Sequence, residues 1–598
     1  MRQRTHLLAL SGYVLLTGVL TWPVLPRLST HLAGGPDPDL WVFQWNNWWL
    51  RQALQRGINP YHTDLLFHPQ GVSLTAHSFS WGMSALWLLL ESLVGPVAAY
   101  NLTLLLTFVL SGYTMYLLAR EFSDHAGAAF VAGLVLAFCP YRLSQSTAHI
   151  SLAAMQWLPL FMLYLVRTVR RCSVRTAVLS GVFLALAGLE CWHFLTFAGL
   201  WSGLYVVYSL VFERGKWRWR AGALLALAAV VCAALIAPLL IPIVREHLSA
   251  GGAGYALPAQ LSKEPADLLA YFTPSRLHPL WGQRVVGIYQ RFTANDRWIA
   301  FVGYGVLALS VYAALRRVRG SGLWLTGAVG FALLALGRDL TIGGVAHADL
   351  FMPYRLVDDI ILFRMLRHPD RFNLMVMLCL AMVVGLAWAD LVRRLPGRTQ
   401  NVALVALTGL ILGEYLALPY PTTEPTVSPF YHQLARDPAD YAIIDLPMGR
   451  QRAKKYMYFQ TIHGKRLVEG MVARTPPEAY AFIEADPLLR LLRSGRPVDS
   501  LSFDVAAHRQ ALAEQGFRYF VLHKDYLPAK TLESWRLLLG PESVYEDDEL
   551  IVYPSLFSPL KSLSLGASRR VSACADASLL RDNGLVGEGR PSAQGPTG

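Results

Sequence analysis

Two aspartates, Asp37 and Asp39, alternate with prolines directly before a run that contains four tryptophans. Asp39 precedes a helical pattern over 40–56, so its side chain can cap that helix, while Asp37 fits a proline-flanked turn. A carboxylate in this position can also act as a general base that takes a proton from an acceptor hydroxyl. The two aspartates could instead hold a divalent cation such as Mg²⁺ or Mn²⁺, although a carboxylate base needs none.

The helical stretch after Asp39 separates into two faces. One face is polar and the other carries indole rings; the polar side chains are Gln44, Asn47, Arg51 and Gln55, and the aromatic ones are Trp41, Trp45, Trp48 and Trp49. This pattern predicts a helix that lies flat at the level of the lipid headgroups, anchored by its tryptophans. The two acids would then sit at its N-terminus.

The chain around this helix is strongly apolar. It has 598 residues, of which 54% are hydrophobic and 16% charged, with a mean hydropathy of +0.36. The apolar residues form blocks of about 20, the length that spans a bilayer. These blocks are 6–26, 98–119, 126–140, 150–166, 173–190, 192–212, 220–243, 298–315, 321–337, 373–391 and 401–419. The sequence therefore predicts a polytopic α-helical membrane protein with about 11 transmembrane helices.

Basic residues fix the predicted orientation. The formal charge of +13 is concentrated in short loops, which are 166–175, 213–220, 316–320 and 392–400. With a cytoplasmic N-terminus, the positive-inside rule places all four loops in the cytoplasm and excludes a nucleic-acid-binding stripe. The first outer loop, 27–97, and everything after 420 are then extracytoplasmic. This count requires the apolar segment 81–99, interrupted by Glu91 and Gly95-Pro96, to enter the membrane without crossing it.

The last third of the chain changes character. Residues 428–556 alternate short apolar runs with polar helical stretches, and the strand patterns lie at 441–447, 466–472, 519–524 and 549–554. We expect an extracytoplasmic α/β domain here, following the transmembrane domain of 1–420. Residues 560–598, rich in Ser, Gly and Ala, are expected to be a disordered tail. The six cysteines form no CxxC motif, so no disulfide framework or zinc site is predicted.

This layout resembles the GT-C glycosyltransferases, membrane enzymes that use polyprenyl-phosphate sugars. Three motifs carry a resemblance to an uncharacterised bacterial, YfhO-like group: "INPYHTDLLFHPQGVSLTAHS" (58–78), "FRMLRHPDRFN" (363–373) and "YMYFQTIHGKRLVEGMVARTP" (456–476). In GT-C enzymes an aspartate of the first outer loop is the usual catalytic residue. The resemblance therefore implies Asp39 as the catalytic base and Asp37 as the second choice.

Further residues of the predicted outer face suit a phosphate or a sugar. Arg367 and Arg371, four apart on a helix, could hold the donor phosphate with their planar guanidinium groups, together with Arg364. The alternative is that these arginines face lipid headgroups. His77, Arg142 and His149 are expected to line the pocket, the alternative being interfacial hydrogen bonding.

Together with the polar residues of the outer face, the GT-C resemblance implies an inverting hexosyl or pentosyl transferase. It would move a sugar from a polyprenyl-phosphate donor to a glycan, lipid or protein acceptor at the outer face of the cell (inner or plasma) membrane, without nucleic acid as a partner. A polytopic lipid or polysaccharide transporter is one alternative, but its spans would carry charges or breaks at the membrane midplane. The other is a non-catalytic cell-envelope assembly protein, in which the outer domain rather than Asp39 is essential.

Overall fold

The structure is a computed structural model that describes residues 2–35, 39–212, 219–249, 265–292, 299–360, 363, 366, 368–498 and 502–556. Residues 1–556 form one compact unit. The predicted tail, 560–598, lies outside the described residues. So do Asp37, Arg364 and Arg367.

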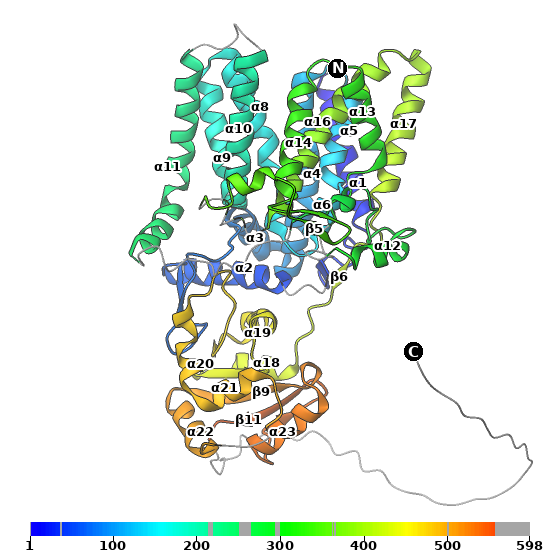
Figure 1. The fold of residues 1–598 in the computed structure, drawn as a ribbon. Helices are drawn as coiled ribbons and strands as arrows, with labels where there is room; N and C mark the ends of the chain where they lie inside the picture. Colours follow the sequence, from blue (N-terminus) through cyan, green and yellow to red (C-terminus); the bar gives the residue numbers. More distant parts are fainter. Residues whose placement is uncertain are drawn as a thin grey trace, which may run out of the picture. The chain divides into compact units, whose positions relative to one another are not determined.

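A bundle of helices contains all the predicted apolar blocks (Figure 1). Its helices are α1 (Arg2–Leu20), α4 (Pro96–Phe122), α5 (Ala126–Phe138), α6 (Pro140–Ser146), α7 (Ile150–Ala153), α8 (Trp157–Arg171), α9 (Val174–Glu190), α10 (His193–Phe212), α11 (Trp219–Ser249), α13 (Tyr304–Leu315), α14 (Gly322–Ala335), α16 (Asn373–Val392) and α17 (Gly397–Glu414). Among the described residues, 5 helices are long and apolar enough to cross a membrane, or 6 if the bent pair α5–α6 is one span. The chain is thus a helical membrane protein, and the number of spans stays a prediction.

Two shorter helices lie at one end of this bundle (Figure 1). They are α2 (Asp39–Arg56) and α3 (Trp81–Val94). The 14 residues of α3 extend for only about 21 Å, less than the roughly 30 Å of a hydrocarbon core. Helix α14 of the bundle has the same number of residues, so whether segment 81–99 crosses the membrane stays a prediction. The small strands β2 (His62–Thr63) and β3 (Val72–Ser73) form a hairpin between the two helices.

Residues after 428 form a five-stranded sheet with helices around it. The strands are β7 (Ala442–Leu446), β8 (Arg466–Leu467), β9 (Phe517–His523), β10 (Tyr545–Glu546) and β11 (Leu550–Pro554), in the order β10-β11-β9-β7-β8. The helices are α18 (Pro429–Arg436), α19 (Arg450–His463), α20 (Ala481–Ala485), α21 (Pro487–Ser494), α22 (Val505–Glu514) and α23 (Ala529–Leu539). Each of the four predicted strands overlaps an observed one. The central strand β7 is buried along its whole length and pairs in parallel with β8 and β9.

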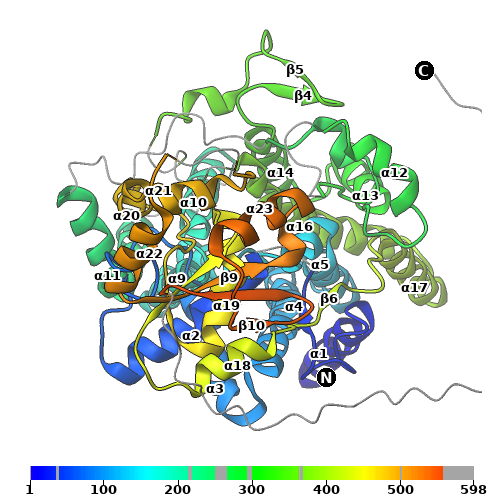
Figure 2. The ribbon, with the colours of Figure 1, turned by 90° about the horizontal axis from the view of Figure 1, so that it is seen from below.

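A few smaller elements lie outside the helix bundle and the five-stranded sheet. They are α12 (Gly282–Tyr289) and the antiparallel pairs of β4 (Leu340–Ile342) with β5 (Val345–His347) and of β1 (Leu32–Ala33) with β6 (Thr422–Thr423). In Figure 2 the β4–β5 hairpin stands at the edge of the view. The β1–β6 pair joins the segment after α1 to the segment after α17. It therefore brings the first outer loop and the start of the C-terminal α/β region to the same end of the bundle.

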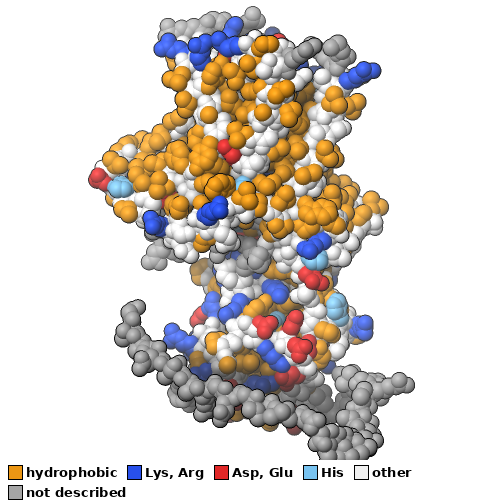
Figure 3. Space-filling view, turned by 90° about the vertical axis from the view of Figure 1, so that its right-hand side faces the viewer, with side chains coloured by type: hydrophobic (Ala, Val, Ile, Leu, Met, Phe, Trp, Pro, Cys, Tyr) orange, Lys and Arg blue, Asp and Glu red, His pale blue; other side chains and the backbone are white. Residues whose placement is uncertain are grey.

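The side chains at the surface differ between the bundle and the α/β region (Figure 3). Hydrophobic side chains cover most of the visible bundle surface, as expected for helices in contact with lipid. Charged side chains of both signs are frequent on the α/β region, and Lys and Arg also gather at the opposite end of the bundle.

The tryptophan face of α2 packs on protein, so its predicted role as a lipid anchor is wrong. The four indoles are nearly inaccessible, with exposed fractions of 6% for Trp41, 0% for Trp45, 7% for Trp48 and 1% for Trp49. They contact α19 and neighbouring parts of the α/β region, as Figures 1 and 2 show for the two helices. The polar face packs on α3, where Asn47 accepts a hydrogen bond from Ser84 and Arg51 pairs with Glu91. Helix α2 is therefore a layer between the bundle and the α/β region.

Candidate functional site

Asp39 is the first residue of α2, and its carboxylate joins two distant parts of the chain. Nε2 of His149, from the turn between α6 and α7, lies 2.8 Å from Oδ2. Nζ of Lys454, in α19, donates a hydrogen bond to Oδ1. The predicted catalytic residue thus sits where the first outer loop, the bundle and the α/β region meet.

The surroundings of Asp39 stabilise its charged form. Its side chain is 26% exposed, whereas that of Lys454 is only 6% exposed. Burial acts to raise the pKa of Asp39, but the hydrogen bonds and charges of His149 and Lys454 outweigh it and hold the pKa well below its usual range. Asp39 is therefore an anion at every pH at which the protein would work.

His149 is held from both sides. While Nε2 contacts Asp39, Nδ1 lies 3.1 Å from Oε1 of Gln145, one turn earlier in the chain. Both ring nitrogens are engaged, so the imidazole fixes the direction of the Asp39 carboxylate. Its predicted place in a substrate pocket stays a prediction.

His77 also lies at this junction, in the first outer loop. Its Nδ1 accepts a hydrogen bond of 3.2 Å from the backbone N–H of Ala473, so Nε2 carries the proton and donates to Oδ1 of Asn46 at 2.7 Å. Burial lowers the pKa of His77 to about 3, the charge of Arg450 acts in the same direction, and the charge of Asp39 opposes both. His77 is therefore a neutral residue that holds Asn46 of α2 against the α/β region.

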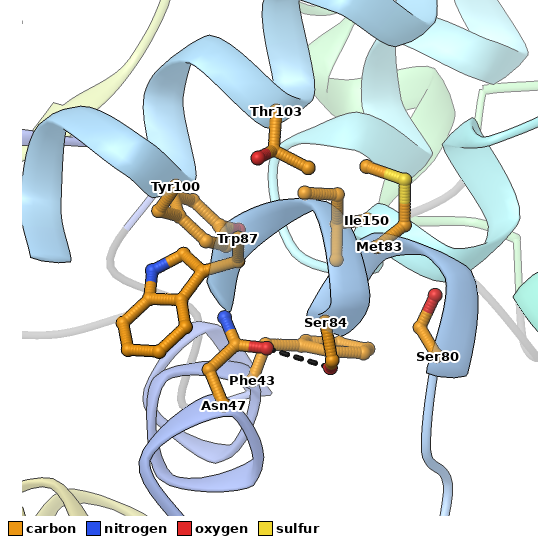
Figure 4. A pocket seen from close by; sticks show the side chains of 9 residues that line it. All are labelled: Phe43, Asn47, Ser80, Met83, Ser84, Trp87, Tyr100, Thr103 and Ile150. Atoms are coloured by element: carbon orange, nitrogen blue, oxygen red, sulfur yellow. Dashed lines mark hydrogen bonds between the residues drawn. The ribbon is translucent and has the colours of Figure 1, made fainter. Parts of the chain in front are cut away.

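A small hollow lies between α2 and α3 (Figure 4). It is lined by side chains of α2, α3, α4 and the start of α7; these are Phe43, Asn47, Ser80, Met83, Ser84, Trp87, Tyr100, Thr103 and Ile150. Most of the lining is apolar, with the Asn47–Ser84 hydrogen bond of 2.7 Å on one side. Two of the lining residues are close in sequence to the pair of Asp39 and His149, since Phe43 follows Asp39 by one helical turn and Ile150 adjoins His149.

Buried Glu190, at the end of α9, holds one wall of this hollow. Its Oε2 accepts hydrogen bonds from Ser80 Oγ at 3.2 Å and from the N–H of Met83 at 3.0 Å, both at the start of α3. Its Oε1 accepts from Gln156 at 3.2 Å and from the indole of Trp157 at 3.0 Å. With four donors on one carboxylate, Glu190 ties the α3 wall to the bundle.

Arg371, one of the predicted phosphate-binding residues, contacts another histidine. It lies in a short 3₁₀ helix (Pro369–Phe372), and its Nη1 is 3.3 Å from Nε2 of His193. The neighbouring Asp370 is buried and accepts a hydrogen bond of 2.6 Å from the hydroxyl of Tyr141. No described contact joins Arg371 to Asp39, so its role in holding the donor phosphate stays a prediction, as do those of Arg364 and Arg367.

Arg142, predicted to line the pocket, has another role in the structure. It is 0% exposed and donates hydrogen bonds to the carbonyl oxygens of Ala137 at 2.6 Å and Ala153 at 2.9 Å. It also reaches Thr107 Oγ1 at 3.0 Å and stacks over Phe108. The break between α5 and α6, where Pro140 prevents a continuous helix, and the end of α7 each leave a carbonyl group that this guanidinium satisfies. Arg142 therefore positions the turn that carries His149.

Lys454 was not among the residues predicted from the sequence. A basic helix face could have been read from "RQRAKKY", where Arg450 and Lys454 are four residues apart and so share a helical face. Nothing in that spacing indicates a contact with Asp39. A divalent metal ion also stays a prediction. Among the described residues no group of three His, Cys, Asp or Glu side chains could hold one, and Asp37 lies outside the described residues.

The chain matches one family model and resembles several solved structures at low sequence identity. The family model described as "Domain of unknown function (DUF6311)" matches residues 9–412, and no curated protein matches the chain. The archaeal oligosaccharyltransferase AglB from Archaeoglobus fulgidus, solved with an inhibitory peptide and a dolichol-phosphate, is 12% identical. The match covers 87% of this chain and 70% of that chain, with a TM-score of 0.47.

Two further solved structures are similar at the same level. The Archaeoglobus fulgidus oligosaccharyltransferase in complex with Zn and sulfate is 14% identical over 87% of this chain and 68% of that chain, with a TM-score of 0.48. The arabinofuranosyltransferase AftD from Mycobacteria is 17% identical over 91% of this chain but only 41% of that chain, with a TM-score of 0.49. At these values the likeness says nothing about the reaction of this chain.

Proposed function

The chain belongs to the DUF6311 family, and we propose from the chemistry of its site that it is a membrane glycosyltransferase. It transfers a sugar from a polyprenyl-phosphate donor to an acceptor at the extracytoplasmic face, with Asp39 as general base. The observation that carries the proposal is the position of Asp39. An ionised carboxylate stands at the end of the bundle, between apolar helices and a water-exposed α/β region.

This position suits a reaction between a lipid-borne donor and a polar acceptor. The tail of the donor can stay beside the apolar helices while its sugar reaches the α2 layer. The acceptor can approach from the side of the α/β region. The same position follows from the GT-C resemblance, in which an aspartate of the first outer loop is the usual catalytic residue.

The reaction would be a single displacement at the anomeric carbon. Asp39 takes the proton of the acceptor hydroxyl, the acceptor oxygen bonds to the anomeric carbon, and the bond from that carbon to the phosphate oxygen breaks. The electron pair leaves with polyprenyl phosphate, so the configuration inverts. His149 holds the carboxylate in one orientation, and pre-orientation of this kind lowers the barrier.

The test is donor consumption by the purified protein in liposomes. Radiolabelled polyprenyl-phosphate hexoses and pentoses are offered with membrane glycans and lipids, and release of polyprenyl phosphate is measured. We expect turnover by the wild type and its loss in Asp39→Asn. Asp64→Asn is the matched control, because Asp64 lies in the same loop with a side chain 64% exposed.

Two results of this assay would contradict the proposal. If the wild type consumed no donor, or if Asp39→Asn turned over like the wild type, the glycosyltransferase proposal would fail. A transporter or an assembly protein would then be favoured, and the effect of removing 428–556 would separate those two.

A further inference from the structure

Lys454 has a buried ammonium group whose hydrogen-bonding capacity is only partly used. Its side chain is 6% exposed, and among the described residues its hydrogen-bond partner is Asp39. An ammonium group has three donors, and buried polar groups in folded proteins are nearly always satisfied. Two donors therefore point to a further acceptor beside Lys454.

The described contact of Lys454 with Asp39 is made to one carboxylate oxygen, Oδ1, while Oδ2 lies beside Nε2 of His149. The face of α19 around Lys454 is cationic, since Arg450 precedes Lys454 by one turn. The charge of Arg450 also acts to lower the pKa of nearby His77. A site with a buried cation and spare donors is complementary to an anion that brings several acceptor oxygens, as a phosphate does.

We propose that Lys454 binds the phosphate of the lipid carrier and moves from Asp39 to that phosphate as the sugar is transferred. This inference rests on the proposed function, because it assigns the leaving group of that reaction to a residue. When the bond from the anomeric carbon to the phosphate oxygen breaks, the phosphate gains one negative charge. The Lys454 ammonium lies beside the base and can stabilise that charge as it develops.

The movement of Lys454 also changes the base. In the structure Lys454 and His149 lower the basicity of Asp39, which disfavours proton uptake. When the ammonium turns to the phosphate, Asp39 loses one of its two described hydrogen-bond partners and becomes more basic. Donor binding would thus prepare the carboxylate to accept the proton of the acceptor hydroxyl.

Binding of the sugar-free leaving group tests this inference without any turnover. Affinity for undecaprenyl phosphate is measured on the full chain in detergent, for the wild type and for Asp39→Asn, Lys454→Met and the double variant Asp39→Asn/Lys454→Met. The control is Lys455→Met, since Lys455 lies over the rings of Phe459 and Tyr526 instead. Inorganic phosphate, phosphatidic acid and undecaprenol are offered as competing probes.

We expect Asp39→Asn to bind undecaprenyl phosphate at least as tightly as the wild type, because it releases Lys454 from its partner. Lys454→Met and the double variant should bind about tenfold more weakly or worse, the usual effect of losing a hydrogen bond to a charged group. Lys455→Met should bind like the wild type. The double variant is decisive, because it leaves no buried carboxylate unpaired and so separates phosphate binding from folding.

Two results would overturn the inference. If the double variant bound as tightly as Asp39→Asn, Lys454 would serve only to neutralise Asp39. If phosphatidic acid or inorganic phosphate bound as tightly as undecaprenyl phosphate, the site would not be specific for the carrier. Lys454-dependent binding without sugar transfer would instead contradict the proposed function and leave the phosphate site in place.

Discussion

The indole of Trp45 donates a hydrogen bond from Nε1 to Oε1 of Gln460 at 2.8 Å, across 415 positions of sequence. Trp45 is fully buried, and the amide of Gln460 donates in turn to the carbonyl oxygens of Leu65 and Lys465, both at 2.8 Å. One glutamine thus ties α2, the first outer loop and the α/β region together. This junction holds Lys454 against Asp39.

Loss of the Trp45 donor should loosen the junction. Trp45→Phe keeps most of the aromatic packing but leaves Oε1 of Gln460 without its donor, which should lower the free energy of unfolding by about 1–3 kcal/mol. The measurement is thermal unfolding in detergent together with the rate of proteolysis of the α/β region. Trp219→Phe is the control, because Trp219 is 85% exposed and should change neither. A Trp45→Phe variant as stable as the control would show that the hydrogen bond contributes nothing.

Replacement of His149 should change the pH dependence of transfer. His149 favours the charged form of Asp39, so His149→Ala should raise the pKa of the carboxylate. The acidic limb of the pH–rate profile reports protonation of the base, and in the wild type it should lie below the usual range of an aspartate. In His149→Ala it should move to higher pH. An acidic limb that stayed in place would mean that another group governs it.

His77 should make stability depend on pH in a defined window. Burial lowers the pKa of His77 to about 3, below its ordinary value of 6.5, so the unfolded chain binds this proton more readily. The neutral histidine therefore contributes stability above pH 6.5 that is lost as the pH falls toward 3, by about 1.4 kcal/mol per pH unit. His77→Gln should reduce this slope by one proton. His463, whose pKa burial lowers to about 4, should keep a similar slope in both proteins.

Arg142 should matter for folding rather than for substrate. Arg142→Met leaves the carbonyl oxygens of Ala137 and Ala153 without donors, which should cost roughly 2–5 kcal/mol. The expected result is a lower melting temperature and a lower yield of folded protein. Arg171→Met should be near neutral, since that side chain is 60% exposed. Normal stability with lost phosphate binding would instead restore Arg142 to the pocket.

Reporter fusions should place the site in the cell. A reporter at position 172 should be active in the cytoplasm, and one at position 560 outside, if the basic loops face inward. Because Asp39 and Lys454 are in contact, both belong to the side that carries the α/β region. A cytoplasmic signal at position 560 would move the site to the inner face.

Local pattern was enough to find most elements. Every apolar block contains a helix, and each predicted strand overlaps an observed one, because hydrophobic length and alternation are read within a few residues. Asp39 was singled out by its place at a helix N-terminus together with the GT-C resemblance, and its catalytic role stays a prediction. The partners of Asp39 are different: His149 lies 110 positions away and Lys454 lies 415 positions away. Their contacts depend on how the layers pack.

The tryptophan face shows the same limit. A helix face of Trp41, Trp45, Trp48 and Trp49 is equally suited to lipid headgroups and to an aromatic protein surface, since both remove indole rings from water. Only the position of α19, with Tyr458 against Trp41 at 4.8 Å between ring centroids, decides between them. Arg142 is similar, because an arginine near a loop has no local sign that it will be fully buried.

The arrangement of the α2 layer sets an order of events during synthesis. Asp39 leaves the ribosome hundreds of residues before α19. Because α19 follows α17 and α18 in the chain, Lys454 can contact Asp39 only after those helices have been synthesised. Until then the nascent protein has a carboxylate without its lysine, and the indoles of α2 lack their cover. A chain interrupted anywhere before the α/β region would thus lack both the contact of Lys454 with Asp39 and the cover of the α2 indoles, however well its helices were integrated.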